Sequence, residues 1–155
     1  MSQPGSPVVL APGPSDELKR MGRKLGYAIA IGLNLVGLII VNNILDWGWP
    51  AFITSDFAEV VPWLNIAMTT GIVLNILYMA RDDRLMKSGG QVVSNLLSLY
   101  VTYRVLTVYP FDFGAYTFNW DLIAHFVLIL ALIGSGIGVI TEAVKLTSAV
   151  SRDRD

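Results

Sequence analysis

A chain of 155 residues with 54% hydrophobic side chains, only 15% charged side chains and a mean hydropathy of +0.57 is too apolar for a water-soluble domain of this length. The chain has no cysteine and a single histidine, His125, which excludes disulfides, thiolate metal sites, iron–sulfur clusters and a haem held by two histidines of one chain. We therefore expect neither a metal site nor a cofactor.

Residues 1–15 form a segment rich in proline, glycine and serine. Such a segment cannot bury enough apolar surface to offset the entropy cost of ordering, so we predict a disordered tail. Residues 16–146 are expected to form the membrane domain, and residues 147–155 a short cytoplasmic tail.

Four apolar runs follow the tail, at about 25–45, 62–80, 91–109 and 120–144. Each is long enough to cross a ~30 Å hydrocarbon layer, for which a helix needs ~20 residues. The first run is too long for the apolar region of a cleaved signal peptide. None shows the alternation of barrel strands. The runs predict an all-α polytopic membrane protein, with four transmembrane helices in an up-down bundle.

The placement of lysine and arginine predicts the orientation of these helices. Ten of the 11 cationic residues lie before the first run, between the second and third runs, or after the fourth: Lys19, Arg20, Arg23, Lys24, Arg81, Arg84, Lys87, Lys145, Arg152 and Arg154. The other two connections contain none. By the positive-inside rule, both termini face the cytoplasm.

The two outer connections, residues 46–61 and 110–121, are acidic and aromatic, and all four tryptophans lie in or next to them. Aromatic rings with a polar edge prefer the headgroup level, so these segments are expected to lie along the outer membrane interface. A short interfacial helix capped by Asp56 is expected in the first of them.

Polar side chains within the runs fall into helical stripes. This polar seam consists of Asn65, Thr69, Asn75, Ser94, Asn95, Ser98, Thr102 and Ser135. One interpretation is interhelical hydrogen bonding. The other is a hydrated path for an ion, a proton or a small polar solute. The sequence leaves both open.

Arg104 is the only cationic residue inside a run. Its guanidinium stays charged, so it must reach the interface or pair with an acid. Asp46 and Asp121 are expected at a similar depth, with His125 one turn deeper than Asp121. We predict an outer charge cluster of these four residues, either as a salt bridge that locks the helix ends or as a gate or proton relay.

Small residues that allow close helix approach occur at Gly26, Gly37, Gly134 and Gly138, and the last two have GxxxG spacing. These glycines are expected at helix contacts, within one chain or between copies. The cytoplasmic basic clusters could also bind anionic lipid headgroups.

No nucleophile elbow, HExxH, P-loop or dinucleotide fingerprint is present, so neither an enzyme nor a nucleic-acid-binding protein is expected. The stretches at residues 52–57 (FITSDF), 61–65 (VPWLN) and 108–113 (VYPFDF) resemble those of a group of uncharacterised four-helix membrane proteins of bacteria, actinobacteria especially. The resemblance covers roughly residues 26–146 and implies a bacterial plasma membrane and a shared fold. We expect a non-enzymatic structural or accessory subunit of a homo-oligomer or membrane complex. The alternative is a small channel or transporter that uses the polar seam.

Overall fold

The computed structural model describes residues 13–81 and 83–152, and every regular element within them is helical. The elements are α1 (Pro14–Trp47), the 3-10 helix η1 (Ser55–Glu59), α2 (Val61–Ala80), α3 (Arg84–Val108) and α4 (Trp120–Arg152). The predicted all-α class is confirmed. Most of the expected disordered tail lies outside the described residues, but α1 already begins at Pro14. The expected C-terminal tail is helical as far as Arg152.

Local sequence explains where the helices begin and end. α1 starts with Pro14, whose missing N–H costs nothing in the first turn, and ends at Trp47, where the next residue, Gly48, takes a left-handed φ of 61°. The Asp83 side chain accepts from the N–H of Leu85 at 3.3 Å at the start of α3. Asn119 does the same for Leu122 at 3.1 Å at the start of α4.

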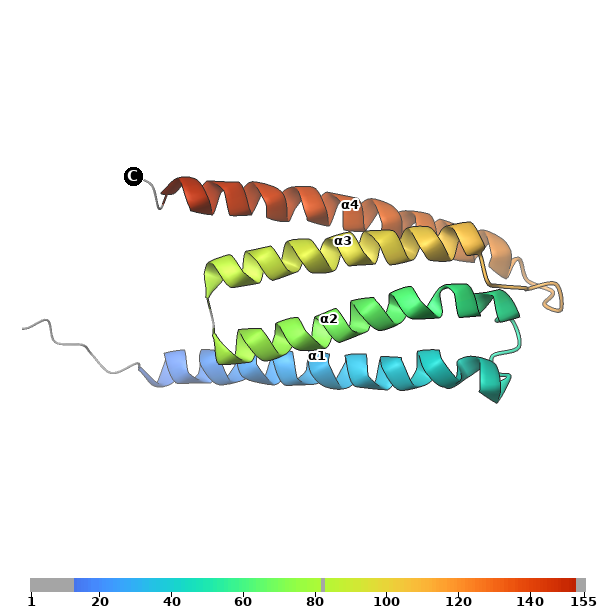
Figure 1. Cartoon of the computed structure of the whole chain (residues 1–155), viewed down its shortest axis with the longest axis horizontal. Helices are drawn as coiled ribbons and strands as arrows, with labels where there is room; N and C mark the ends of the chain where they lie inside the picture. The colour runs from blue at the N-terminus through green and yellow to red at the C-terminus, as the bar shows by residue number, and fades with distance from the viewer. Residues whose placement is uncertain (1–12, 82, 153–155) are drawn as a thin grey trace, which may run out of the picture.

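The four long helices form an open row (Figure 1). α1 packs on α2, α2 on α3 and α3 on α4, while the described residues of α1 and α4 make no contact with each other. The connections lie at alternate ends, so successive helices reverse direction. A bundle closed around one core would need the missing contact between α1 and α4. The row instead leaves the outward sides of α1 and α4 without a helical neighbour.

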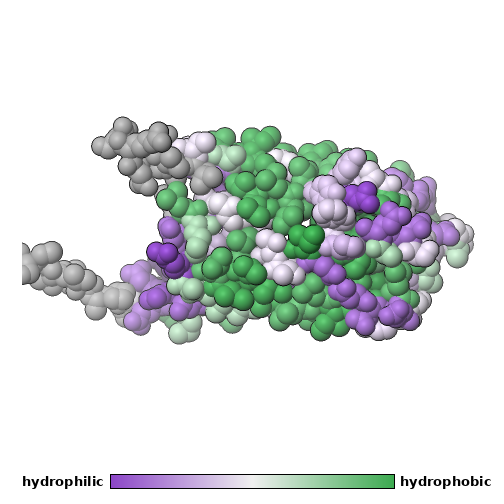
Figure 2. All heavy atoms as spheres, in the orientation of Figure 1, coloured by the Kyte–Doolittle hydropathy of each residue, from purple (hydrophilic) through white to green (hydrophobic). Residues whose placement is uncertain are grey.

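Three of the helices are long and apolar enough to cross a membrane: Ser15–Trp47 within α1, Val61–Ala80, and Trp120–Lys145 within α4. α3 has 25 residues, about 37 Å of helix, but its many polar side chains keep it out of this group. Figure 2 shows apolar residues over the middle of the molecule and hydrophilic residues gathered toward its two ends. This distribution is typical of a protein whose middle contacts hydrocarbon.

Little of the long helices is buried within the single chain. The buried hydrophobic residues among those described are Phe57, Val60 and Val101, and Pro110 is also fully buried. Three of these four lie at the end of the molecule that carries the α1–α2 and α3–α4 connections, here called the loop end. The tightest packing is therefore in the connections and not between the membrane-length helices.

Candidate functional site

The two connections at the loop end pack together into one unit, here called the aromatic cap and defined as residues 48–60 and 109–119. A short antiparallel bridge pairs Ile53 with Phe111. In this bridge the N–H of Thr54 donates to the carbonyl of Pro110 at 3.0 Å, and the N–H of Asp112 donates to the carbonyl of Phe52 at 2.8 Å. The bridge joins the α1–α2 hairpin to the α3–α4 hairpin through main-chain atoms.

Aromatic rings surround this bridge. Phe52 stacks on Phe113 with ring centroids 5.1 Å apart and meets Phe111 and Tyr116 at 6.3 and 6.4 Å. The separations lie in the range of favourable aromatic pairs, so the rings add to the stability of the cap. The expected short helix is present as η1, but it follows Thr54, and its first turn has no side-chain cap from Asp56.

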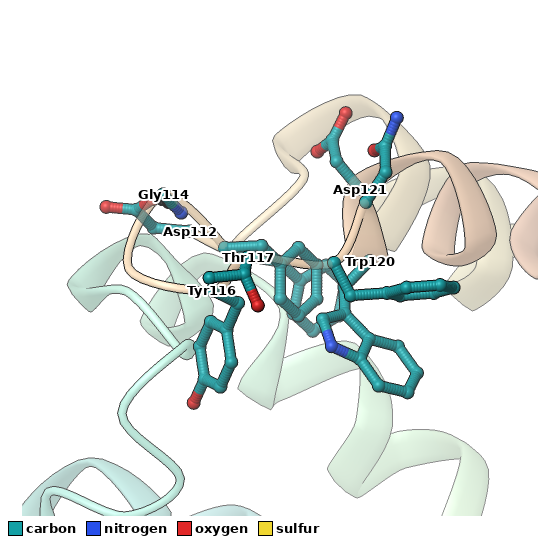
Figure 3. A pocket seen from close by; sticks show the side chains of 10 residues that line it. Asp112, Gly114, Tyr116, Thr117, Trp120 and Asp121 are labelled. Atoms are coloured by element: carbon teal, nitrogen blue, oxygen red, sulfur yellow. Dashed lines mark hydrogen bonds between the residues drawn. The ribbon is translucent and has the colours of Figure 1, made fainter.

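Two cavities open on the aromatic cap. The first, the polar cavity, has a volume of about 430 Å³ and lies in the α3–α4 connection, with Asp112, Thr117, Asn119 and Asp121 among its lining residues. Figure 3 shows Asp112 and Asp121 on opposite sides of this cavity, with Thr117 between them. It is an open depression that small polar groups can enter from the loop end.

The second, the apolar cavity, has a volume of about 410 Å³ and an almost entirely apolar lining. Phe52 closes one side, and Ile123, Ala124 and Val127 of α4 form another. Both volumes fall within the ~300–1,000 Å³ of typical ligand pockets. Three aromatic residues, Phe113, Tyr116 and Trp120, line both cavities, so the two share a wall.

The predicted outer charge cluster is divided in the structure. Arg104 pairs with Glu59 of η1, with Nη2 and Oε2 3.7 Å apart, and with neither Asp46 nor Asp121. Glu59 is largely exposed, with 64% of its side-chain surface accessible. The Nε atom of Arg104 is buried and has no hydrogen-bond partner in the described chain. Asp46 forms no ion pair or hydrogen bond through its side chain within the described residues.

Asp121 and His125 do lie together, with a third partner that the sequence analysis did not select. The Tyr109 hydroxyl donates to Asp121 Oδ1 at 2.7 Å, and the Tyr109 ring stacks on His125 with centroids 4.0 Å apart. His125 Nδ1 lies 3.0 Å from the Asp121 carbonyl oxygen. Tyr109 adopts a left-handed φ of 45° at the end of α3, which is uncommon for a residue with a side chain. These contacts fasten the end of α3 to the start of α4.

The polar seam is also divided, between the two hairpins. Asn65 exchanges two hydrogen bonds with Asn42 of α1, at 2.7 and 2.9 Å. Asn95, from α3, lies against Gly138 of α4. Asn75 bonds to a carbonyl of its own helix at Gly71. Ser94, Thr102 and Ser135 are partly buried, whereas Thr69 and Ser98 are exposed.

The four predicted packing glycines behave differently. A Cβ at Gly37 would lie 3.0 Å from the Met68 side chain, and one at Gly138 would lie 3.0 Å from Asn95 Nδ2, so both permit close helix contact. A Cβ at Gly26 or Gly134 would meet nothing within 4 Å in the described chain. Gly90, which was not selected, admits the Tyr78 hydroxyl of α2 so closely that any Cβ would overlap it.

At the opposite end, an aromatic pair joins α1 to α2, and a lysine of α3 lies beside it. The rings of Tyr27 and Tyr78 are 5.7 Å apart, and Lys87 Nζ lies 5.5 Å from the centroid of the Tyr27 ring. Arg20 and Lys24 line a small cavity of about 40 Å³ beside these rings. Part of the predicted basic surface is therefore used in contacts within the chain.

Within the described residues, no three histidine or acidic side chains gather closely enough to hold a metal ion. In comparisons with known proteins, no family model, curated protein or solved structure matches the chain. The resemblance to bacterial four-helix membrane proteins therefore stays a prediction.

Proposed function

We propose that this chain is a four-span integral protein of a bacterial plasma membrane, with both termini in the cytoplasm. The lysines and arginines support this topology, because all but Arg104 lie before residue 25, between residues 81 and 87, or after residue 144. The less apolar α3 is accommodated because it has α2 on one side and α4 on the other, which reduces its contact with lipid.

Its proposed role is that of a small non-enzymatic structural or accessory subunit in a homo-oligomer or larger membrane complex. The observation that carries this proposal is the open row: α1 and α4, the two longest helices, each contact a single long helix. Exposed apolar side chains run along both, including Leu33 and Ile40 of α1 and Phe126 and Ile133 of α4. Such a row offers two lateral surfaces to other subunits.

The placement of the polar seam favours packing over a hydrated path. Asn65 serves the contact of α2 with α1, and Asn95 serves the contact of α3 with α4, so the two amides belong to different helix pairs. Interhelical hydrogen bonds of this kind are a common use of polar residues in membranes.

Cysteine accessibility tests the topology, because the natural chain has no cysteine. Ala51→Cys, Ala80→Cys and Ala115→Cys place single thiols in the two outer connections and at the end of α2. We expect a membrane-impermeant maleimide to label positions 51 and 115 in intact cells, and position 80 only after permeabilisation. Labelling of position 80 in intact cells would overturn the proposed orientation.

Native purification in lipid nanodiscs, with mass measurement of the intact assembly, tests the subunit role. We expect an assembly heavier than the single 16.9 kDa chain. Flux of ions or small solutes in proteoliposomes is the competing outcome. A flux that Asn75→Leu abolishes would replace the subunit role with transport, and a lone chain that carries no flux would refute both.

A further inference from the structure

We propose that the aromatic cap binds a cationic amphiphile, with its hydrocarbon chain in the apolar cavity and its ammonium headgroup in the polar cavity. The proposal goes beyond the subunit role and requires only that the cap lies at the outer membrane interface. The proposal rests on the wall that the two cavities share, which consists of Phe113, Tyr116 and Trp120. A single molecule that lies across this wall would contact both the apolar and the polar cavity.

The apolar cavity has the position and lining for a hydrocarbon chain. It extends from Trp120, the first residue of α4, to Val127, seven residues or about 10 Å further along the helix. The cavity therefore begins at the depth preferred by tryptophan and continues toward the bilayer centre. Its other lining residues, Phe52, Ile123 and Ala124, offer no polar side chain to a ligand.

The polar cavity determines the charge of the headgroup. Asp112 and Asp121 contribute two carboxylates, and neither outer connection contains lysine or arginine. Asp112 Oδ1 accepts a hydrogen bond from the Gly114 N–H at 2.8 Å, and Asp121 Oδ1 accepts one from the Tyr109 hydroxyl at 2.7 Å. Asp121 Oδ2 lies 3.6 Å from His125 Nδ1, and Asp112 Oδ2 is the less engaged oxygen. An ionised carboxylate has further acceptor capacity, so both can still face a cation.

The aromatic wall supports the same choice. An ammonium group is attracted to the face of tryptophan, tyrosine or phenylalanine within about 6 Å of the ring centroid. Phe118 lies against Trp120, with centroids 5.1 Å apart, and adds a further ring to the cavity. An anionic headgroup would meet two carboxylates and the negative faces of these rings, with no lysine or arginine among the lining residues.

The test uses the full-length chain in zwitterionic nanodiscs, with Trp47, Trp49 and Trp63 replaced by phenylalanine so that Trp120 is the only tryptophan, excited selectively at a wavelength where tyrosine does not absorb. Three amphiphiles with the same brominated twelve-carbon chain serve as quenchers, with trimethylammonium, maltoside or sulfate headgroups. Their partition into protein-free nanodiscs sets the bilayer concentration of each. We expect the ammonium probe to quench Trp120 at a concentration about fivefold lower than the maltoside probe, with sulfate the weakest.

Matched variants separate a site from general surface charge. Asp112→Asn with Asp121→Asn should abolish the preference for ammonium, while Asp46→Asn with Asp56→Asn removes the same charge from the other connection and should retain it. Ala124→Phe, which fills the apolar cavity, should weaken quenching by all three probes, and Ala131→Phe lower on α4 should not.

Three outcomes would overturn the proposal. These are equal quenching by ammonium and maltoside, equal loss of preference in both pairs of asparagine variants, and unchanged quenching in Ala124→Phe. Asp112→Asn alone, which keeps an acceptor for the Gly114 N–H, gives a readout if the double variant does not fold. It should lose part of the preference, and a full fivefold ratio there would also contradict the proposal.

Discussion

Alanine at Asn42 or Asn65 removes a reciprocal amide pair between α1 and α2. Asn42 Nδ2 donates to Asn65 Oδ1 at 2.7 Å, and Asn65 Nδ2 donates to Asn42 Oδ1 at 2.9 Å. Asn42 Nδ2 also reaches the Leu38 carbonyl of its own helix at 2.7 Å. The two single variants are therefore not equivalent. Asn65→Ala leaves Asn42 with one partner, whereas Asn42→Ala removes both of these hydrogen bonds from Asn65.

The geometry gives the expected magnitude. Interhelical hydrogen bonds in membrane proteins contribute about 0.6 to 1.7 kcal/mol each, so two bonds give a coupling free energy of about 1–3 kcal/mol. An unpaired amide in an apolar environment costs about 1–3 kcal/mol more. We expect Asn42→Ala to lower the free energy of unfolding more than Asn65→Ala does, and the double variant to cost less than the sum of the two.

Equilibrium unfolding in mixed micelles, monitored by the circular dichroism of the helices, gives the free energy of unfolding of the wild type, the two single variants and the double variant in this double-mutant cycle. Asn43→Ala is the matched control, because Asn43 donates to the Ile39 carbonyl of its own helix and not to α2. A coupling free energy below about 0.5 kcal/mol, the usual error of additivity, would refute the role of the pair.

Three further predictions concern single contacts. Arg104→Ala should lower the melting temperature more than Glu59→Gln, because Glu59 is 64% exposed and can be hydrated, whereas Arg104 is 31% exposed and its Nε atom is buried. An equal shift would contradict this. Gly138→Leu should destabilise the chain by about 1–3 kcal/mol through overpacking. Gly134→Leu, which meets open space, should leave the stability of the monomer unchanged. If chemical denaturation showed an equal loss of stability for the Gly134 and Gly138 variants, the contact between Gly138 and Asn95 would be refuted. Gly48→Ala should cost about 1 kcal/mol in the same assay, because the φ of 61° disfavours a Cβ, and a neutral result would refute that strain.

Hydropathy predicted the positions of the long helices well because an apolar run is a property of local composition. The predicted ranges 25–45 and 120–144 lie within α1 and α4. Both helices continue past these ranges, since Lys, Arg, Glu and Leu outside an apolar core still favour helix. The open row was not predicted, because apolar faces do not reveal which neighbour each helix contacts.

The charged contacts show a similar limit. Depth along a helix led us to predict Asp46 and Asp121 as the acids near Arg104, but depth does not specify direction around the helix axis, and the acid that Arg104 meets is Glu59. Glu59 lies beside Arg104 because η1 places it there, and its distance from Arg104 in the sequence gives no sign of this contact. The contact between Tyr109 and Asp121 could have been predicted more easily from the sequence. Tyr109 directly follows one helix of a hairpin and Asp121 lies in the first turn of the next, so the connection between the two helices brings them together.

The bridge between Ile53 and Phe111 has a consequence for how this chain can vary over evolution. Its two hydrogen bonds use only amide and carbonyl groups, and Pro110 enters as an acceptor, which is the single main-chain role that proline retains. Most side-chain replacements around the bridge would therefore leave its hydrogen bonds intact. Distant homologues would be free to change their ring residues and acids while they keep the same linkage of hairpins, provided that insertions do not shift the pairing.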